Sequence, residues 1–232
     1  GWADLKTAWG FSILLEVNGT KILFDSGPSP SILEENVRKL GMDLSDLDFV
    51  VLSHEHGDHV GGMPYIAKVK PGARVYVPKG ISDHTLRWLR GMGFRVEELE
   101  GPTRLAKGVL TTGSMRGPPS EQGLIISVKE LGSILVTGCA HPRVELMAER
   151  AHNLTGKVYA VLGGFHLASA GEGRLERIAE VMEDLGVRRI FPIHCSGDVA
   201  RSYFERRMPD AYGDGHVGMR IRFSSSGVEV TP

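Results

Sequence analysis

The sequence predicts an α/β fold, and an αββα sandwich, in which helices cover two packed sheets, satisfies its pattern. An early β-hairpin opens the chain, with two strand-like runs joined through Asn18-Gly19, a strong hairpin turn signal. Apolar strand-like runs and amphipathic helical patterns then alternate in both halves. This mixture favours sheets covered by helices over a purely parallel doubly wound sheet.

The expected elements follow from hydrophobic periodicity and from glycine or proline at their ends. Strands are expected at residues 11–17, 21–24, 49–52, 74–77, 94–99, 109–112, 124–128, 134–136, 158–162, 190–193, 217–223 and 228–230. Helices are expected at residues 31–40, 143–154, 175–185 and 198–207. No repeat or linker-like stretch interrupts the pattern, so a single domain over residues 1–232 is expected.

Composition excludes several classes of function. The 232 residues include 41% hydrophobic and 24% charged residues, ordinary values for a globular protein. The net charge of −1 gives no reason to expect a nucleic-acid partner. No apolar run is long enough for a membrane span and no signal segment is seen, so we expect a cytoplasmic protein without a membrane partner. Two cysteines, Cys139 and Cys195, are too few for a disulfide framework.

Histidines stand at the ends of four expected strands. His54 and His194 follow their strands directly, and His141 and His166 come a few residues after theirs. The carboxyl ends of strands gather at one edge of a sheet, where sites form in α/β proteins. One such histidine would be taken as a structural residue, but four together predict a site.

The run from Ser53 to His59 carries the strongest chemical signal. Imidazoles at His54 and His56 and the carboxylate of Asp58 are good ligands for zinc or iron. Gly57 lets the loop fold tightly, so that Asp58 and His59 can face a second centre. The alternative is a polar surface loop that binds no ligand, but three histidines and two acids directly after a buried strand favour a metal site.

These motifs resemble the metallo-β-lactamase superfamily. The matching pieces are Phe-Asp-Ser-Gly at residues 24–27, the His-x-His-x-Asp-His run followed by Gly61-Gly62, and the late histidines. The resemblance covers nearly the whole chain and implies a four-layer αββα sandwich with one or two divalent metal ions at the sheet edge. Zinc is the first choice, with iron or manganese as alternatives.

The resemblance also implies a role for each matching residue. Asp25 is expected beside the histidine loop as a partner of the ligands. The implied metal ligands are His54 and His56 for the first ion, and Asp58, His59 and His194 for the second.

The chain departs from the superfamily pattern where many members have an Asp that bridges the metals. The run from Thr137 to His141 reads Thr-Gly-Cys-Ala-His, and Glu121 stands upstream where a histidine is common. We infer that His141 supplies the missing imidazole. Cys139 aligns with the bridging position but is interpreted as a small buried residue beside the ligands. Whether Cys139 or Glu121 contacts metal stays open.

Three further runs resemble a narrower subgroup, related to an archaeal synthase of methanopterin biosynthesis. These runs are residues 137–141, 163–167 (Gly-Gly-Phe-His-Leu) and 194–197 (His-Cys-Ser-Gly). That synthase joins a pterin diphosphate to a ribofuranosyl-aminobenzene phosphate. Because one fold hosts many chemistries, membership of the subgroup does not by itself assign the reaction.

Metal-assisted hydrolysis of a small anionic substrate is the leading hypothesis. Asp58 would hold its metal and His166 would donate a hydrogen bond or a proton, with a purely loop-anchoring role for His166 as the alternative. Helix N-termini near His141 or Ser196, the latter also a partner of the ligands, could receive the anion. The oligomeric state is not predicted.

Two other classes of function stay open. One is a metal-dependent transferase that displaces diphosphate from a flat, pterin-like ring, for which we name stacking candidates: Phe165, Tyr203, Phe204 and Tyr212. The other is a non-hydrolytic metal-binding or redox protein, which visible absorption of bound iron would reveal. We expect no flavodoxin-like extension to receive electrons, which weighs against the redox hypothesis.

Overall fold

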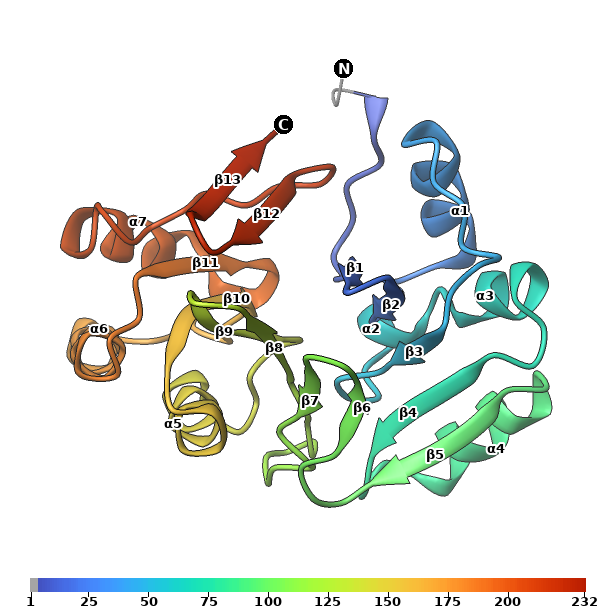
Figure 1. Cartoon of the computed structure of the whole chain (residues 1–232). Helices are drawn as coiled ribbons and strands as arrows, with labels where there is room; N and C mark the ends of the chain where they lie inside the picture. The colour runs from blue at the N-terminus through green and yellow to red at the C-terminus, as the bar shows by residue number, and fades with distance from the viewer. Residues whose placement is uncertain (1–3) are drawn as a thin grey trace.

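The computed structural model describes residues 4–232, and its strands form two main sheets and a separate hairpin (Figure 1). The first sheet has the order β1 (Ile13–Val17), β2 (Thr20–Phe24), β3 (Phe49–Val51), β4 (Arg74–Pro78) and β5 (Arg95–Leu99). The second runs in reverse order along the chain, namely β11 (Arg189–Ile193), β10 (Val158–Gly164), β9 (Gly132–Thr137), β8 (Leu124–Val128), β7 (Val109–Thr111) and β6 (Arg104–Ala106). The hairpin comprises β12 (Arg220–Ser224) and β13 (Gly227–Thr231).

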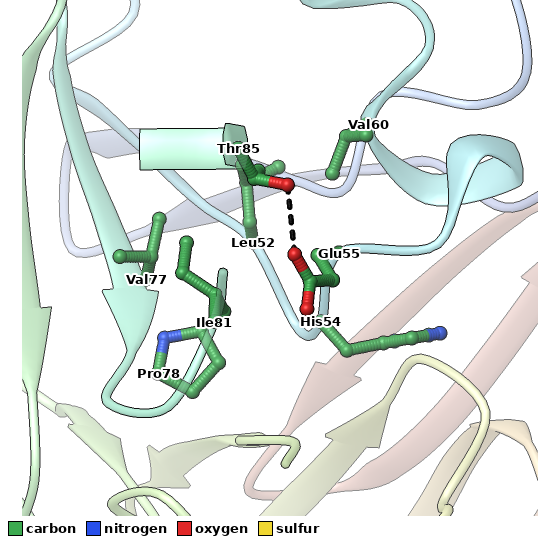
Figure 2. A pocket seen from close by; sticks show the side chains of 8 residues that line it. All are labelled: Leu52, His54, Glu55, Val60, Val77, Pro78, Ile81 and Thr85. Atoms are coloured by element: carbon green, nitrogen blue, oxygen red, sulfur yellow. Dashed lines mark hydrogen bonds between the residues drawn. The ribbon is translucent and has the colours of Figure 1, made fainter. Parts of the chain in front are cut away.

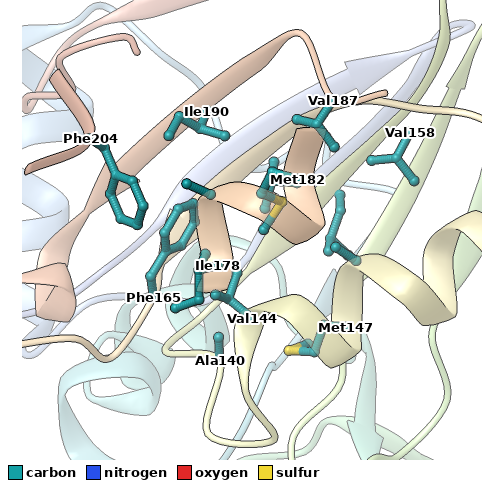
Figure 3. Close-up of a cluster of buried hydrophobic side chains, with 14 of the residues drawn as sticks. Ala140, Val144, Met147, Val158, Phe165, Ile178, Met182, Val187, Ile190 and Phe204 are labelled. Carbon is teal, nitrogen blue, oxygen red and sulfur yellow. The ribbon is translucent and has the colours of Figure 1, made fainter. Parts of the chain in front are cut away.

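Three apolar clusters define four layers and confirm the predicted αββα sandwich. One cluster lies between the sheets and includes Phe24, Val51, Leu124 and Val136. The second lies between the first sheet and its helices, which are α1 (Pro30–Lys39), α3 (Met63–Val69) and α4 (Asp83–Gly91). The third, shown in Figure 3, lies between the second sheet and α5 (Val144–Thr155), α6 (Glu172–Asp184) and α7 (Asp198–Arg207).

Most expected elements are confirmed, and the differences lie in short segments. The predicted opening hairpin is present, with Ile13 opposite Phe24. Five elements of the described chain were missed, namely the helices α2 (Gly57–Val60), α3 and α4, the 3-10 helix at His194–Ser196 and the short strand β6. The two longest of them, α3 and α4, have only 7 and 9 residues, so each offers only about two turns of pattern. None of the helices in the described part of the chain is long and apolar enough to span a membrane.

Parallel pairing brings the ends of the site-bearing strands together. In the first sheet β2 and β3 run parallel with Phe24 opposite Val51, so Asp25 and His54 both lie just beyond its carboxyl edge. In the second sheet β9, β10 and β11 run parallel, so Cys139, His166 and His194 follow their carboxyl ends. The predicted gathering of these segments at one edge of each sheet is therefore confirmed.

Candidate metal centre

Two groups of metal-ligating side chains meet where the edges of the two sheets face each other. The first group contains His54, Cys139 and His141, and the second group contains Asp58, His59, Cys139 and His194. Within each group the donor atoms lie within 4.8 Å of one another. The structure thus brings together five of the six residues that the sequence predicted as metal ligands and adds Cys139 to both groups.

The sixth predicted ligand, His56, lies beside these groups rather than within them. Its ring centroid is 4.8 Å from that of His54 and 5.0 Å from that of His141. The side chain of His56 is exposed at the N-terminal end of the short helix α2 (Gly57–Val60). His56 therefore faces the same imidazole cluster from the solvent side.

Asp25 fixes the orientation of the histidine loop from beneath. Its carboxylate is fully buried and accepts hydrogen bonds from the Ser53 backbone N–H at 2.7 Å and from Ser53 Oγ at 2.6 Å. Asp25 Oδ2 also lies 2.7 Å from His59 Nδ1. A proton held on Nδ1 by this carboxylate leaves His59 Nε2 free to bind a metal, which is the usual role of a carboxylate behind a histidine ligand.

A shared cation explains the positions of the donor atoms better than hydrogen bonds among the donors do. His59 Nε2 lies 3.1 Å from both Cys139 Sγ and His194 Nε2, and Asp58 Oδ2 lies 3.0 Å from His194 Nε2. His54 Nε2 and His141 Nε2 are buried nitrogens with no hydrogen-bond partner among the described residues. Buried polar atoms are nearly always satisfied, so these two nitrogens indicate a missing partner. The residues present therefore fit the divalent ion that the fold implies.

The pKa shifts of His54 and His141 also favour the binding of a metal ion. Burial and the neighbouring imidazoles of His59 and His141 hold the pKa of His54 far below its usual range. Burial, with His166 and His56 beside it, lowers the pKa of His141 to about 4. Both imidazoles are therefore neutral at pH 7, and the neutral form is the one that binds metal.

In the second group, unlike the first, nearby carboxylates outweigh the effect of burial on the pKa of a histidine. Burial alone would lower the pKa of His59, but the carboxylates of Asp25 and Asp58 raise it to about 10. Burial would likewise raise the pKa of Asp58, but hydrogen bonds with His194 and His59 hold it well below its usual range. A cation bound to these donors would neutralise the charge of the two carboxylates in place of the proton on the His59 imidazolium.

Glu121 holds the loop that carries Cys139 and His141. Its carboxylate is fully buried and accepts hydrogen bonds from the backbone N–H groups of Cys139 at 3.2 Å, Ala140 at 2.7 Å and His141 at 3.3 Å. Burial raises the pKa of Glu121 to about 7 despite these bonds. Glu121 acts as a positioning residue for two donors, and it belongs to neither donor group in the described structure.

Glu55, the other acid of the histidine run, faces away from the donors. Its Oε2 accepts hydrogen bonds from Ser82 N at 3.0 Å, Ser82 Oγ at 2.6 Å and Thr85 Oγ1 at 2.7 Å. Figure 2 shows the Glu55 carboxylate turned toward Thr85, while the His54 side chain extends away from it. Glu55 thus ties the histidine loop to the first turn of α4.

The backbone around the centre adopts conformations that ordinary residues resist. Positive φ angles occur at five non-glycine residues of the site, namely Asp25 (58°), Ala140 (58°), Arg143 (87°), His166 (52°) and His194 (53°). Such angles are rare outside glycine and cluster at functional sites. All five residues lie in the loops that follow β2, β9, β10 and β11.

An open pocket of about 420 Å³ lies on the His141 side of the centre. Its lining residues are Ala140, His141, Arg143, Phe165, His166 and Arg174. The buried Glu145 carboxylate holds both arginines, with Arg143 Nη2 and Arg174 Nη1 each 2.8 Å from its Oε1. One carboxylate between two guanidinium groups leaves a net positive charge beside the imidazoles.

The remaining predicted site residues occupy distinct positions. His166 is exposed, and its ring centroid lies 4.5 Å from that of His141. Ser196 is fully buried, donates to Ile193 O at 2.7 Å and accepts from Phe165 N at 3.1 Å. With both bonds made inside the protein, Ser196 supports the two loops that carry His166 and His194 rather than meeting solvent.

Of the candidate stacking residues, only Phe165 lines this pocket. Its side chain is 1% exposed within the apolar cluster of Figure 3, so it offers little surface to a flat ring. Phe204 is fully buried in the apolar cluster of Figure 3, so its predicted role at a substrate is wrong. The hydroxyls of Tyr203 and Tyr212 bond to Glu176 and Asp214. The sequence interpretation missed Trp9, which is 66% exposed and whose ring centroid lies 4.7 Å from that of His194.

Comparison with known proteins agrees with this fold. The family model of the metallo-beta-lactamase superfamily matches residues 10–194. The chain therefore belongs to the metallo-β-lactamase superfamily, as the sequence motifs predicted.

Individual proteins of known sequence or structure are also similar to this chain. The chain is 30% identical to 7,8-dihydropterin-6-methyl-4-(β-D-ribofuranosyl)-aminobenzene-5'-phosphate synthase of Methanocaldococcus jannaschii, with 92% of this chain and 90% of the synthase covered. A solved structure of a metal-dependent hydrolase of the β-lactamase superfamily superposes with a TM-score of 0.76 at 25% identity, covering 93% of this chain and 92% of that one. Isothiocyanate hydrolase from Delia radicum gut bacteria has a TM-score of 0.65 at 15% identity over 93% and 97% of the two chains, a likeness of fold alone.

Proposed function

We propose that this chain is a metal-dependent hydrolase of a small anionic substrate, with a phosphate or phosphoester as the recognised group. The observation that carries the proposal is the pocket of about 420 Å³ that joins the metal-ligating His141 to the guanidinium groups of Arg143 and Arg174. Arginine recognises phosphate and carboxylate through paired N–H donors. A substrate anion held there would place its reacting end against the donor cluster.

The donor set supports one or two divalent ions, with zinc first and iron or manganese as alternatives. His54, His56 and His141 would hold one ion, and Asp58, His59 and His194 the other. When bound, such ions lower the pKa of a coordinated water to about 7 and neutralise charge that develops on phosphoryl oxygens. The superfamily relationship and the metal-dependent hydrolase at 25% identity support this class of chemistry.

The protein's own residues supply orientation and proton transfer. Asp25 holds His59 and, through Ser53, the start of the histidine loop. His166 lies at the exposed end of the pocket, where burial and neighbouring imidazoles lower its pKa and keep it neutral at pH 7. A neutral imidazole carries one N–H and one free nitrogen, so it can donate a hydrogen bond to the substrate or move a proton at the leaving group.

A transferase is the second candidate, favoured by the similarity to the synthase along nearly the whole of both chains. The same pocket could bind a diphosphate leaving group, while the exposed Trp9 ring beside His194 offers a surface for a flat ring. In this reaction an amine or carbon nucleophile would replace water.

The reaction in ¹⁸O-labelled water separates the two candidates. The metal-loaded protein is incubated with a panel of phosphoesters, neutral esters and pterin diphosphates, the last with and without an aromatic amine as acceptor. The products are analysed by mass spectrometry. We expect one ¹⁸O atom per hydrolysed bond in the released products. A joined product without label would support transfer, and turnover of neutral esters only would contradict both candidates.

The two arginines give a direct test of anion recognition. Replacing Arg143 or Arg174 with glutamine should raise KM for an anionic substrate by about 10- to 100-fold, because a hydrogen bond to a charged group contributes about 1.5–3 kcal/mol. Each single variant leaves the other arginine to pair with the buried Glu145. Steady-state kinetics would measure the change, which should fall mainly on KM.

Arg177 provides the matched control on the same helix. It lies on α6 three residues after Arg174, with 68% of its side chain exposed and only a 3.8 Å pair with Glu180. Arg177→Gln should leave KM unchanged. Equal KM values for the native protein and both pocket variants would contradict the assignment of the pocket as the anion site.

A further inference from the structure

We propose that Cys139 is a thiolate ligand shared by the two metal positions, in the place where a carboxylate would otherwise bridge them. Among the described residues, Cys139 alone belongs to both donor groups, with His54 and His141 in one and with Asp58, His59 and His194 in the other. This inference rests on the proposed metal centre but not on the proposed substrate.

The surroundings of Cys139 hold its sulfur between the two groups. The side chain is 4% exposed, and Sγ lies 3.1 Å from His59 Nε2 on the second-group side. On the first-group side, His54 is 1% exposed and its Nε2 has no hydrogen-bond partner among the described residues. The three N–H bonds to Glu121 fix the backbone from Cys139 to His141, and with it the point from which the sulfur projects between the two groups.

The chemistry of sulfur suits this position. A thiolate binds zinc at about 2.3 Å, and it has lone pairs enough for two ions. Coordination releases the thiol proton, since a metal-bound thiol is deprotonated outright. A soft donor in the shared position favours zinc or iron over magnesium, calcium or manganese, which prefer oxygen ligands. The proposal therefore narrows the choice of metal.

Cys195 supplies a matched control. It is also buried, at 5% exposed, and its Sγ lies 3.7 Å from the carbonyl oxygen of Cys139. Although it follows the ligand His194 directly, Cys195 belongs to neither donor group in the described structure. A loss of sulfur there should disturb packing to the same degree as a loss at Cys139 without removing a ligand.

Cobalt(II) substitution tests the proposal by spectroscopy, independently of turnover. The native protein and the Cys139→Ser, Cys139→Asp and Cys195→Ser variants are loaded with cobalt, and near-ultraviolet absorption and metal content are measured. We expect a thiolate-to-cobalt charge-transfer band in the native protein and in Cys195→Ser, and no band in either Cys139 variant. Cys139→Ser should bind at least one ion about 10-fold more weakly or worse, since even indirect partners of a ligand cost that much.

Cys139→Asp keeps the proposal testable if the serine variant folds poorly. Its carboxylate should restore the bound-metal content without restoring the band. A band that persists in both Cys139 variants, or a native protein that binds two cobalt ions without any band, would overturn the thiolate assignment alone. A native protein that binds no cobalt would overturn the metal centre itself.

Discussion

Replacing His59 with alanine is expected to lower kcat/KM by at least about 10³-fold and to remove one metal ion per chain. His59 Nε2 lies 3.1 Å from both Cys139 Sγ and His194 Nε2, so its loss breaks the centre of the second donor group. A bound metal contributes several kcal/mol of charge stabilisation, and each 1.36 kcal/mol corresponds to tenfold in rate. Elemental analysis and steady-state kinetics on the same preparation would measure both effects.

His84 provides the control for a general effect of removing a histidine. It is exposed on α4, away from both donor groups in the described structure. His84→Ala should retain the native metal content and rate. Native metal content together with a native rate in His59→Ala would contradict the assignment of the second donor group.

Much of the donor set was predictable because its signals are local in sequence. His54, His56, Asp58 and His59 fall within one loop after a short buried strand, and ligand chemistry can be read from such a run directly. His194 could be added because it directly ends an apolar strand. Parallel strands then bring distant segments to one edge, a consequence of sheet geometry rather than of detailed packing.

Asp25 was predicted as a partner of the donors through the family resemblance, but the contacts of Glu121 and Arg174 could not be predicted, because their partners lie in distant parts of the chain. Glu121 contacts the backbone N–H groups of residues 18 to 20 positions later. Arg174 meets Glu145 across 29 positions and two helices. An acid or an arginine on a helix has no local feature that tells such a contact from a solvated charge, so the anion pocket appears only once the helices are placed.

Cys139 shows a different limit on what can be predicted from the sequence. The sequence placed it at the bridging position, but a small buried cysteine is ordinarily a packing residue, so it was interpreted as lying beside the ligands. Only the distances to two separate donor groups distinguish a shared ligand from a neighbour. Alignment could give the position of this residue along the chain but not how its sulfur is shared between two groups.

Gly138, which follows β9 of the second sheet, lies directly against Ser53 and Asp25 of the first, and Gly138→Ala is expected to disrupt both donor groups at once. A Cβ atom there would lie 2.0 Å from Ser53 Oγ, 2.6 Å from Ser53 Cβ and 3.0 Å from Asp25 Oδ2. Ser53 Oγ bonds to Asp25 Oδ2 at 2.6 Å and lies 2.8 Å from His54 Nδ1. Pushing Ser53 aside therefore moves a partner of each group.

Two measurable losses follow from this contact. Overpacking should cost about 1–3 kcal/mol, which in a chain of this size lowers Tm by about 2–12 °C. Disturbing the partners of the histidine ligands should weaken metal binding by about 10- to 100-fold, with turnover at limiting metal falling in proportion. Calorimetry of the metal-free protein and metal titration would measure the two losses separately.

Gly101→Ala is the control, because a Cβ at Gly101 meets nothing within 4 Å and its φ is not positive. It should leave both Tm and metal affinity near their native values. A Gly138→Ala protein with lowered Tm but native metal affinity would show that the sheets can separate without moving Ser53 and Asp25, and would contradict the coupling between them and the donors. Loss of metal affinity with little change in Tm would contradict the expected cost in stability and would show that the strand ends give way before the core does.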